Sequence, residues 1–118
     1  MIRLELKREP HWLDLGHGVR VHVRPCTTAL VMAARAALAR GSEPVMDEAA
    51  LGARTAAFLK TLARLAIDDW EGVGDAQGQP ATVTPEGVEA LMDLWPIAES
   101  FERHYLGPAL LLDAEKNA

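Results

Sequence analysis

The sequence predicts a single α+β domain that is mostly helical, with about four helices and a small antiparallel β element near its N-terminus. At 118 residues, of which 49% are hydrophobic, the chain can bury one core without disulfides or a structural metal. Its first segments alternate apolar and charged residues, whereas later apolar residues recur at helical spacing. We therefore divide the chain into a β element (1–25), a helical part (27–112) and a tail (113–118) that is expected to fray.

The β element is predicted from three short segments. Residues 2–6 (IRLEL) and 19–23 (VRVHV) alternate apolar and charged side chains, and residues 12–15 (WLDL) do so more weakly. The segment 16–18 (GHG) has two glycines that supply the positive φ angles of a tight turn. We expect 12–15 to pair with 19–23 as a hairpin, with 2–6 as a strand alongside or continuous with it.

Two helices are expected in the first half of the helical part. Pro25 ends the preceding strand, and a following Thr caps a helix over residues 28–40 that contains six alanines. Gly41 stands where the end of a helix favours the left-handed conformation. Asp47 is placed to cap a second helix that extends to Asp69. The apolar stripe of this second helix is expected to comprise Leu51, Phe58, Leu59, Leu62, Leu65 and Ala66.

An acidic, glycine-rich connection precedes two further helices. Residues 71–80 (EGVGDAQGQP) have the composition of consecutive turns. The sequence Thr-Pro-Glu at 84–86 starts a third helix over 85–94, and Pro96 ends it and begins a fourth. The apolar face of the third helix is expected to comprise Val88, Leu91, Met92 and Trp95, and that of the fourth Ile97, Phe101, His104 and Tyr105.

Charge is distributed unevenly along the chain. Residues 1–67 contain ten Lys or Arg and six Asp or Glu, a net of +4, while residues 68–118 contain two and eleven, a net of −9; together they give −5. Internal complementarity, head-to-tail association or an acidic face for a basic partner would each explain this. The basic side of the second helix (Arg54, Lys60 and Arg64) is either a solvated face or a docking strip. The sequence contains no dense basic cluster with interleaved aromatic residues, so it does not predict nucleic-acid binding.

No segment predicts export or membrane insertion. The N-terminus lacks the apolar core of a signal peptide, and no apolar run approaches the roughly 20 residues that span a bilayer. The single cysteine, Cys26, excludes an intrachain disulfide, and its place between a strand and a helix favours a half-buried structural thiol over a catalytic one. We therefore expect a cytoplasmic protein without a membrane partner.

The sequence offers little for catalysis or metal binding. His11, His17 and His22 are close in sequence, but the predicted turn and strand place them apart, which weakens a zinc site. The acidic run 68–71 lacks the spacing of a calcium loop and a partner base. No glycine-rich segment leads into a Lys and a helix, as a phosphate loop requires. We expect no catalytic residue, no metal and no cofactor, and a small metal protein or enzyme is the least favoured alternative.

The three tryptophans, Trp12, Trp70 and Trp95, all lie at the ends of predicted elements. A tryptophan in such a place either closes the core or anchors a partner protein, because it buries much area with few rotatable bonds. The candidate protein-binding residues are Trp70, Val73, Asp75, Pro80, Trp95, Phe101 and Tyr105.

Residues 68–94 (DDWEGVGDAQGQPATVTPEGVEALMDL) contain in order a Trp, a Gly-Val pair, an Asp, a Gly-x-Pro and a Thr-Pro-Glu helix start. In this order the stretch resembles tail assembly chaperones of long-tailed bacteriophages, prophages and gene transfer agents. The β-rich start, the Ala-rich helix after a proline and the final YLGPALL segment are similar to that family as well. The residues of the resemblance are Trp70, Gly72, Val73, Asp75, Gly78, Pro80 and Thr84 to Glu86.

The resemblance implies a non-catalytic function. Such chaperones bind the tape-measure protein, keep its long hydrophobic helices from aggregating and help recruit tail-tube protein in the host bacterial cytoplasm, and they are absent from the mature virion. The implied partners are thus the tape-measure and tail-tube proteins. The sequence leaves open whether the protein also forms a homo-oligomer. The alternative is a structural head–tail connector or tail-completion protein.

Overall fold

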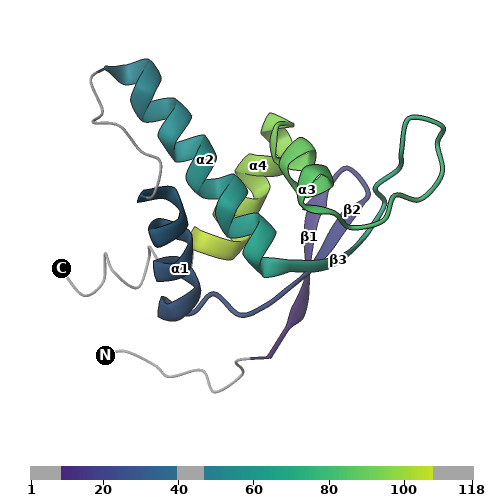
Figure 1. Ribbon diagram of the computed structural model, residues 1–118. Coiled ribbons are helices and arrows are strands. Elements are labelled where there is room, and N and C mark those ends of the chain that lie inside the picture. The colour runs from purple at the N-terminus through teal and green to yellow at the C-terminus, as the bar shows by residue number, and fades with distance from the viewer. Residues whose placement is uncertain (1–8, 40–46, 108–118) are drawn as a thin grey trace.

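A computed structural model describes residues 9–39 and 47–107 and confirms an α+β fold that is mostly helical (Figure 1). The strand expected at 2–6, the helix end at Gly41 and everything beyond residue 107 lie outside the described residues. The elements are β1 (His11–Gly16), β2 (Val19–Val23), α1 (Thr28–Ala39), α2 (Glu48–Ala66), β3 (Ile67–Glu71), α3 (Pro85–Met92), α4 (Trp95–Phe101) and the π-helical turn η1 (Glu102–Leu106).

The predicted hairpin is formed by β1 and β2, which pair antiparallel with Leu13 opposite Val21. Gly16 and Gly18 have φ angles of 80° and 77°, as the turn prediction requires, and His17 between them is also left-handed at 56°. The backbone N–H of Gly16 donates to the Asp14 carboxylate at 2.8 Å. Local residues alone therefore specify this turn.

The third strand of the sheet is β3, and here the sequence prediction was wrong. The second helix ends at Ala66 instead of Asp69, because Ile67 turns extended (φ −82°, ψ 120°) and the chain pairs antiparallel with β2. The sheet order is β1-β2-β3. An acidic segment with few β-branched residues does not predict a strand, so the pairing with the valine-rich β2 determines this conformation.

One face of the sheet belongs to the core. Leu13, Val21 and Trp70 lie in one row across the three strands, and the buried side chains of α3, α4 and η1 belong to the same cluster. The opposite face is polar and partly aromatic: the guanidinium of Arg20 lies 5.0 Å from the Trp12 ring, and the Trp12 and His22 rings are 5.2 Å apart. Alternation along β2 thus separates a buried face from a solvated one.

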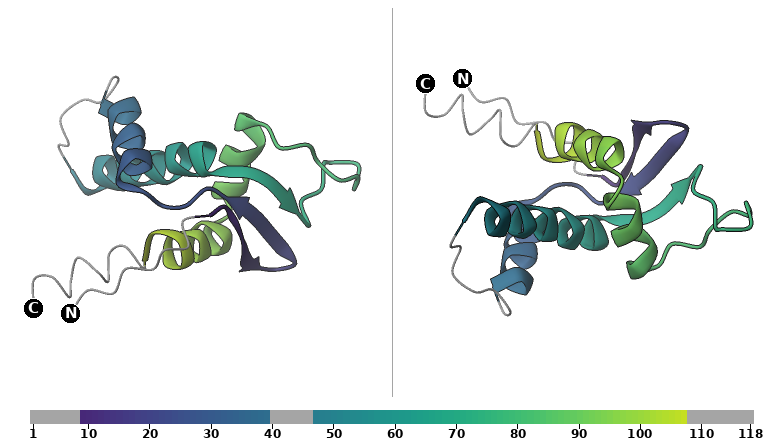
Figure 2. Two further views of the ribbon diagram at one scale, coloured as in Figure 1. Left: turned by 90° about the horizontal axis from the view of Figure 1, so that it is seen from below. Right: turned by 90° about the horizontal axis from the view of Figure 1, so that it is seen from above.

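Helix α2 begins as predicted, with the Asp47 carboxylate accepting from the backbone N–H of Ala50 at 2.7 Å. Helix α1 packs against it, and together they form an arm beside the sheet (Figure 2). Leu51, expected in the apolar stripe, is exposed, because the buried stretch of α2 begins only at Leu59. Met32 on α1 is exposed as well.

Ion pairs join the basic first half of the chain to its acidic second half. Lys60 and Arg64 on α2 pair with Asp93 and Glu89 of the α3 region at 2.6 and 3.9 Å. Arg20 pairs with Glu71 across the sheet at 3.1 Å, and His22 lies 2.5 Å from Asp68. The charge asymmetry is therefore satisfied in part within the molecule, and only Arg54 of the predicted basic strip stays without an ion pair among the described residues.

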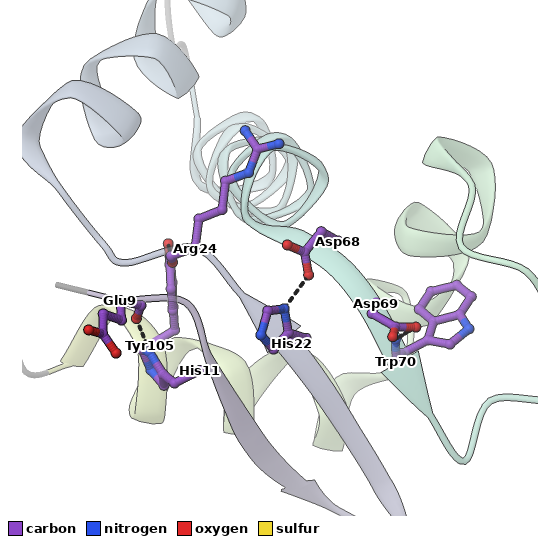
Figure 3. Close-up of polar contacts among 8 residues, drawn as sticks. All are labelled: Glu9, His11, His22, Arg24, Asp68, Asp69, Trp70 and Tyr105. Carbon is purple, nitrogen blue, oxygen red and sulfur yellow. Dashed lines mark hydrogen bonds and ion pairs between the residues drawn. The ribbon is translucent and has the colours of Figure 1, made fainter. Parts of the chain in front are cut away.

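The last helix turns its aromatic residues into the core. Phe101 is fully buried, and its ring stacks on Tyr105 with centroids 4.9 Å apart. The Tyr105 hydroxyl donates a hydrogen bond of 2.7 Å to the carbonyl oxygen of Arg24, next to the end of β2 (Figure 3). This bond ties the C-terminal helical turn to the strand that precedes α1.

Tyr105 is expected to ionise only at strongly alkaline pH in the folded protein. Burial first, and nearby Cys26 second, raise the pKa of Tyr105 well above its usual value near 10. Because the folded pKa is the higher one, this contribution to stability is complete below about pH 10 and is lost as pH rises further. As Tyr105 is the only tyrosine, absorbance of the phenolate reports it directly: the midpoint should fall to near 10 in denaturant. An equal midpoint in both states would contradict the burial of this hydroxyl.

Candidate functional site

Trp70 anchors the loop that connects β3 to α3. Its side chain is only 7% exposed, and its indole N–H donates a hydrogen bond of 2.8 Å to the carbonyl oxygen of Ala81, near the far end of the loop. The ring lies against the first turn of α3 (Figure 3): a Cβ added to Gly87 would be 2.9 Å from the Trp70 ring. Glycine at position 87 therefore leaves the space that the indole occupies.

The start of the loop is fixed against the β1–β2 turn. Gly72 has a φ of +80°, and a Cβ at this position would lie 1.9 Å from the carbonyl oxygen of Gly18. The two backbones thus lie so close together that position 72 has no room for a side chain. The loop therefore begins in contact with a turn that is far away in the sequence.

The tip of the loop is a hydrogen-bonded structure built on Asp75. Its carboxylate accepts from the backbone N–H groups of Gln77 and Gln79 at 2.9 and 3.0 Å. Its backbone N–H donates to the Gln79 carbonyl at 2.8 Å, and Gly78 donates to the Asp75 carbonyl at 3.0 Å. An isolated bridge between Gly74 and Pro80 closes the base of this tip. The loop therefore has a defined shape before any partner binds.

The loop projects away from the helices (Figure 1), and its residues from Gly74 to Pro80 are exposed. Val73 at the start of the loop and Ala81 and Val83 at its end are partly buried, and they pack against the core. Of the predicted protein-binding residues, Val73, Asp75 and Pro80 thus come together on one projecting loop. The Trp70 side chain lies in the core at the base of this loop.

The other predicted contact residues divide into buried and exposed. Phe101 and Tyr105, predicted as contact residues, are buried in the core, because the apolar side of α4 and η1 packs against β1; their side chains are not exposed in this structure. Trp95 was expected on the apolar face of α3, but α3 ends at Met92 and Leu94 is extended (φ −82°, ψ 107°). This break turns the Trp95 side chain outward, where it is 67% exposed.

Pro96 was predicted to end the third helix and begin the fourth, and the structure places the break two residues earlier, at Leu94. Trp95 and Pro96 form the first turn of α4, where a proline is tolerated because the backbone N–H has no partner within the helix. Leu94 beside Trp95 is also exposed, so the junction between α3 and α4 presents two large apolar side chains. The strand β3 gave no signal comparable to Pro96, because only its pairing with β2 specifies it.

Histidine side chains make polar contacts, among them His104, whose Nδ1 lies 3.2 Å from the Ser100 hydroxyl. Within ranges 9–39 and 47–107, no three His, Cys, Asp or Glu residues cluster to hold a metal ion. His11 lies 3.1 Å from the Glu9 carbonyl, and His22 contacts Asp68 (Figure 3). Cys26 lies at the predicted junction between a strand and a helix, and burial raises the pKa of its thiol, which disfavours the nucleophilic thiolate.

In the described part of the chain, no helix combines the length and apolar character needed to cross a bilayer. Comparison with models of protein families, with curated proteins and with solved structures finds no match to this chain.

Proposed function

We propose that this protein is a non-catalytic tail assembly chaperone of a long-tailed bacteriophage, a prophage or a gene transfer agent. It binds the tape-measure protein in the host bacterial cytoplasm, assists recruitment of tail-tube protein and leaves before the virion matures. The observation that carries the proposal is the Trp70-anchored loop. The residues of the sequence resemblance, from Trp70 to Glu86, are those that anchor, shape or terminate this loop.

The physical basis of the proposal is the presentation of a preformed surface. A loop that keeps its shape in the free protein loses little conformational entropy on binding, which favours recognition of a partner. Exposed apolar side chains on the arm and at the α3–α4 junction (Met32, Leu51, Leu94 and Trp95) are suited to cover apolar helices of another protein.

The direct test is coexpression with the tape-measure protein encoded in the same gene cluster. A chaperone should keep that protein soluble, copurify with it and be absent from mature particles. Stoichiometric presence in mature particles would instead support a structural head–tail connector or tail-completion protein. Turnover of a small substrate by the purified protein would contradict both.

Asp75→Ala should weaken binding of the tape-measure protein about threefold to tenfold while leaving the fold intact. The substitution removes the two hydrogen bonds that shape the exposed loop tip, so the partner has to order the loop on binding. Isothermal titration calorimetry and circular dichroism check the two parts of this expectation. The matched control is Gln77→Ala, which changes an exposed side chain at the tip but keeps its backbone N–H bonded to Asp75. Equal affinities for the two variants would contradict a role for loop shape.

A further inference from the structure

The α3–α4 junction presents an aromatic surface next to uncompensated negative charge. Trp95 is 67% and Leu94 55% exposed, whereas the adjoining Ile97 and Ala98 are buried. Trp95, Glu99, Glu102, Arg103 and Gly107 line a shallow depression of about 330 Å³, which we call the Trp95 depression. Three of these residues, Trp95, Glu99 and Glu102, follow one another at intervals of four and three along one side of α4 and η1.

The two carboxylates of the Trp95 depression differ in their partners. Glu99 pairs with Arg103 at 2.9 Å, one helical turn away. Glu102 has no ion pair among the described residues. One carboxylate beside an exposed indole is therefore available to a ligand, in the half of the chain whose net charge is −9.

We propose that the Trp95 depression binds an arginine or lysine side chain carried on an apolar helical segment of a partner protein. The cation would lie over the indole, which attracts positive charge through its π-electrons, and would pair with Glu102. Leu94 would contact the apolar residues that flank the cation. The inference rests on the proposed function only in taking the ligand to be a protein segment.

Two other candidate ligands of the Trp95 depression are the chain's own C-terminal residues and a second copy of the chain, and charge disfavours only the first. The chain's own residues 108–118 follow directly after Gly107 but contain two acids and one lysine, a net of −1, so charge does not favour their binding to an acidic surface. A second copy of the chain has exposed basic residues on its arm, Arg35 and Arg54, and self-association is therefore a separate outcome of the test.

The probe is a short amphipathic helical peptide of leucine and alanine that carries arginine on its apolar border, titrated into the full chain. In ¹⁵N NMR spectra the Trp95 indole N–H, assigned with Trp95→Phe, and the backbone N–H groups near Glu102 should shift saturably. A peptide with neutral citrulline in place of arginine should bind at least about fivefold more weakly, because it lacks the charge.

Variants separate the two parts of the site. Trp95→Ala should weaken binding about tenfold and Glu102→Gln about fivefold. The matched control Glu48→Gln removes an exposed carboxylate on α2 that, like Glu102, has no ion pair among the described residues and does not line the Trp95 depression; it should leave the affinity unchanged. Equal binding of the arginine and citrulline peptides, or an equal loss in Glu48→Gln, overturns the proposal. Shifts that depend on protein concentration without peptide overturn it in favour of self-association.

Failure of this inference and failure of the proposed function give different results. If the tape-measure protein binds the wild type and Glu102→Gln equally well, the chaperone proposal stands and the Trp95 depression is not its contact. If the arginine peptide binds at Trp95 but the tape-measure protein does not bind at all, the site stands and the chaperone proposal fails.

Discussion

Replacing Trp70 by alanine should lower the free energy of unfolding by about 3 to 5 kcal/mol, the range for a large buried aromatic residue. The substitution removes the side chain that fills the space over Gly87 and also the hydrogen bond to the Ala81 carbonyl. Urea unfolding followed by circular dichroism measures the loss without using tryptophan fluorescence. A loss below about 1 kcal/mol would mean that Trp70 is a contact residue and not part of the core.

Trp70→Phe is the matched control for this experiment. It keeps an aromatic ring in the core but has no N–H for Ala81, so we expect a loss of about 1 to 3 kcal/mol. Exchange of the amide protons on the loop tip should be faster in both variants, since the loop loses its attachment near Ala81. A loop that stays equally protected in Trp70→Ala would contradict the anchoring role.

Gly72→Ala should destabilise the protein by about 2 to 5 kcal/mol. An L-residue at a φ of +80° costs roughly 1 to 2 kcal/mol, and a Cβ placed 1.9 Å from the Gly18 carbonyl oxygen forces the backbone apart at a further cost of about 1 to 3 kcal/mol. Denaturant unfolding gives the total loss.

The chain contains its own control for the clash. Gly78 has nearly the same φ, +78°, but a Cβ there would have no atom within 4 Å, so Gly78→Ala should show only the conformational cost of roughly 1 to 2 kcal/mol. The difference between the two variants measures the contact between the loop and the β1–β2 turn. Equal losses for Gly72→Ala and Gly78→Ala would show that this contact does not constrain the fold.

The predicted elements that the structure confirms have local determinants. The hairpin turn is specified by Gly16 and Gly18, the start of α2 by Asp47, and the start of α3 by Thr84, whose hydroxyl accepts from the backbone N–H of Gly87. Each depends on residues within a few positions, so composition and spacing are sufficient to predict it.

The features that the sequence did not predict mainly involve contacts between distant segments. Helical periodicity predicted that α2 extends to Asp69, because no residue near Ile67 indicates the pairing with β2. Lys60 and Arg64 were predicted to belong to a solvated face or a docking strip; their ion pairs with Asp93 and Glu89 could not be predicted from spacing, because these partners come far later in the chain. Trp95 was predicted on the apolar face of the third helix and also among the candidate contact residues; it is exposed because α3 ends before Leu94, which is extended.

The sequence by itself determined the fold class, the helix starts, the tight turn and the set of residues that build the loop. Only the tertiary structure decided that Trp70 is a buried support, that Phe101 and Tyr105 face the sheet and that Trp95 faces solvent. The physical reason is that capping and turn preferences act over a few neighbouring residues. Burial depends instead on which distant surfaces the chain brings against one another.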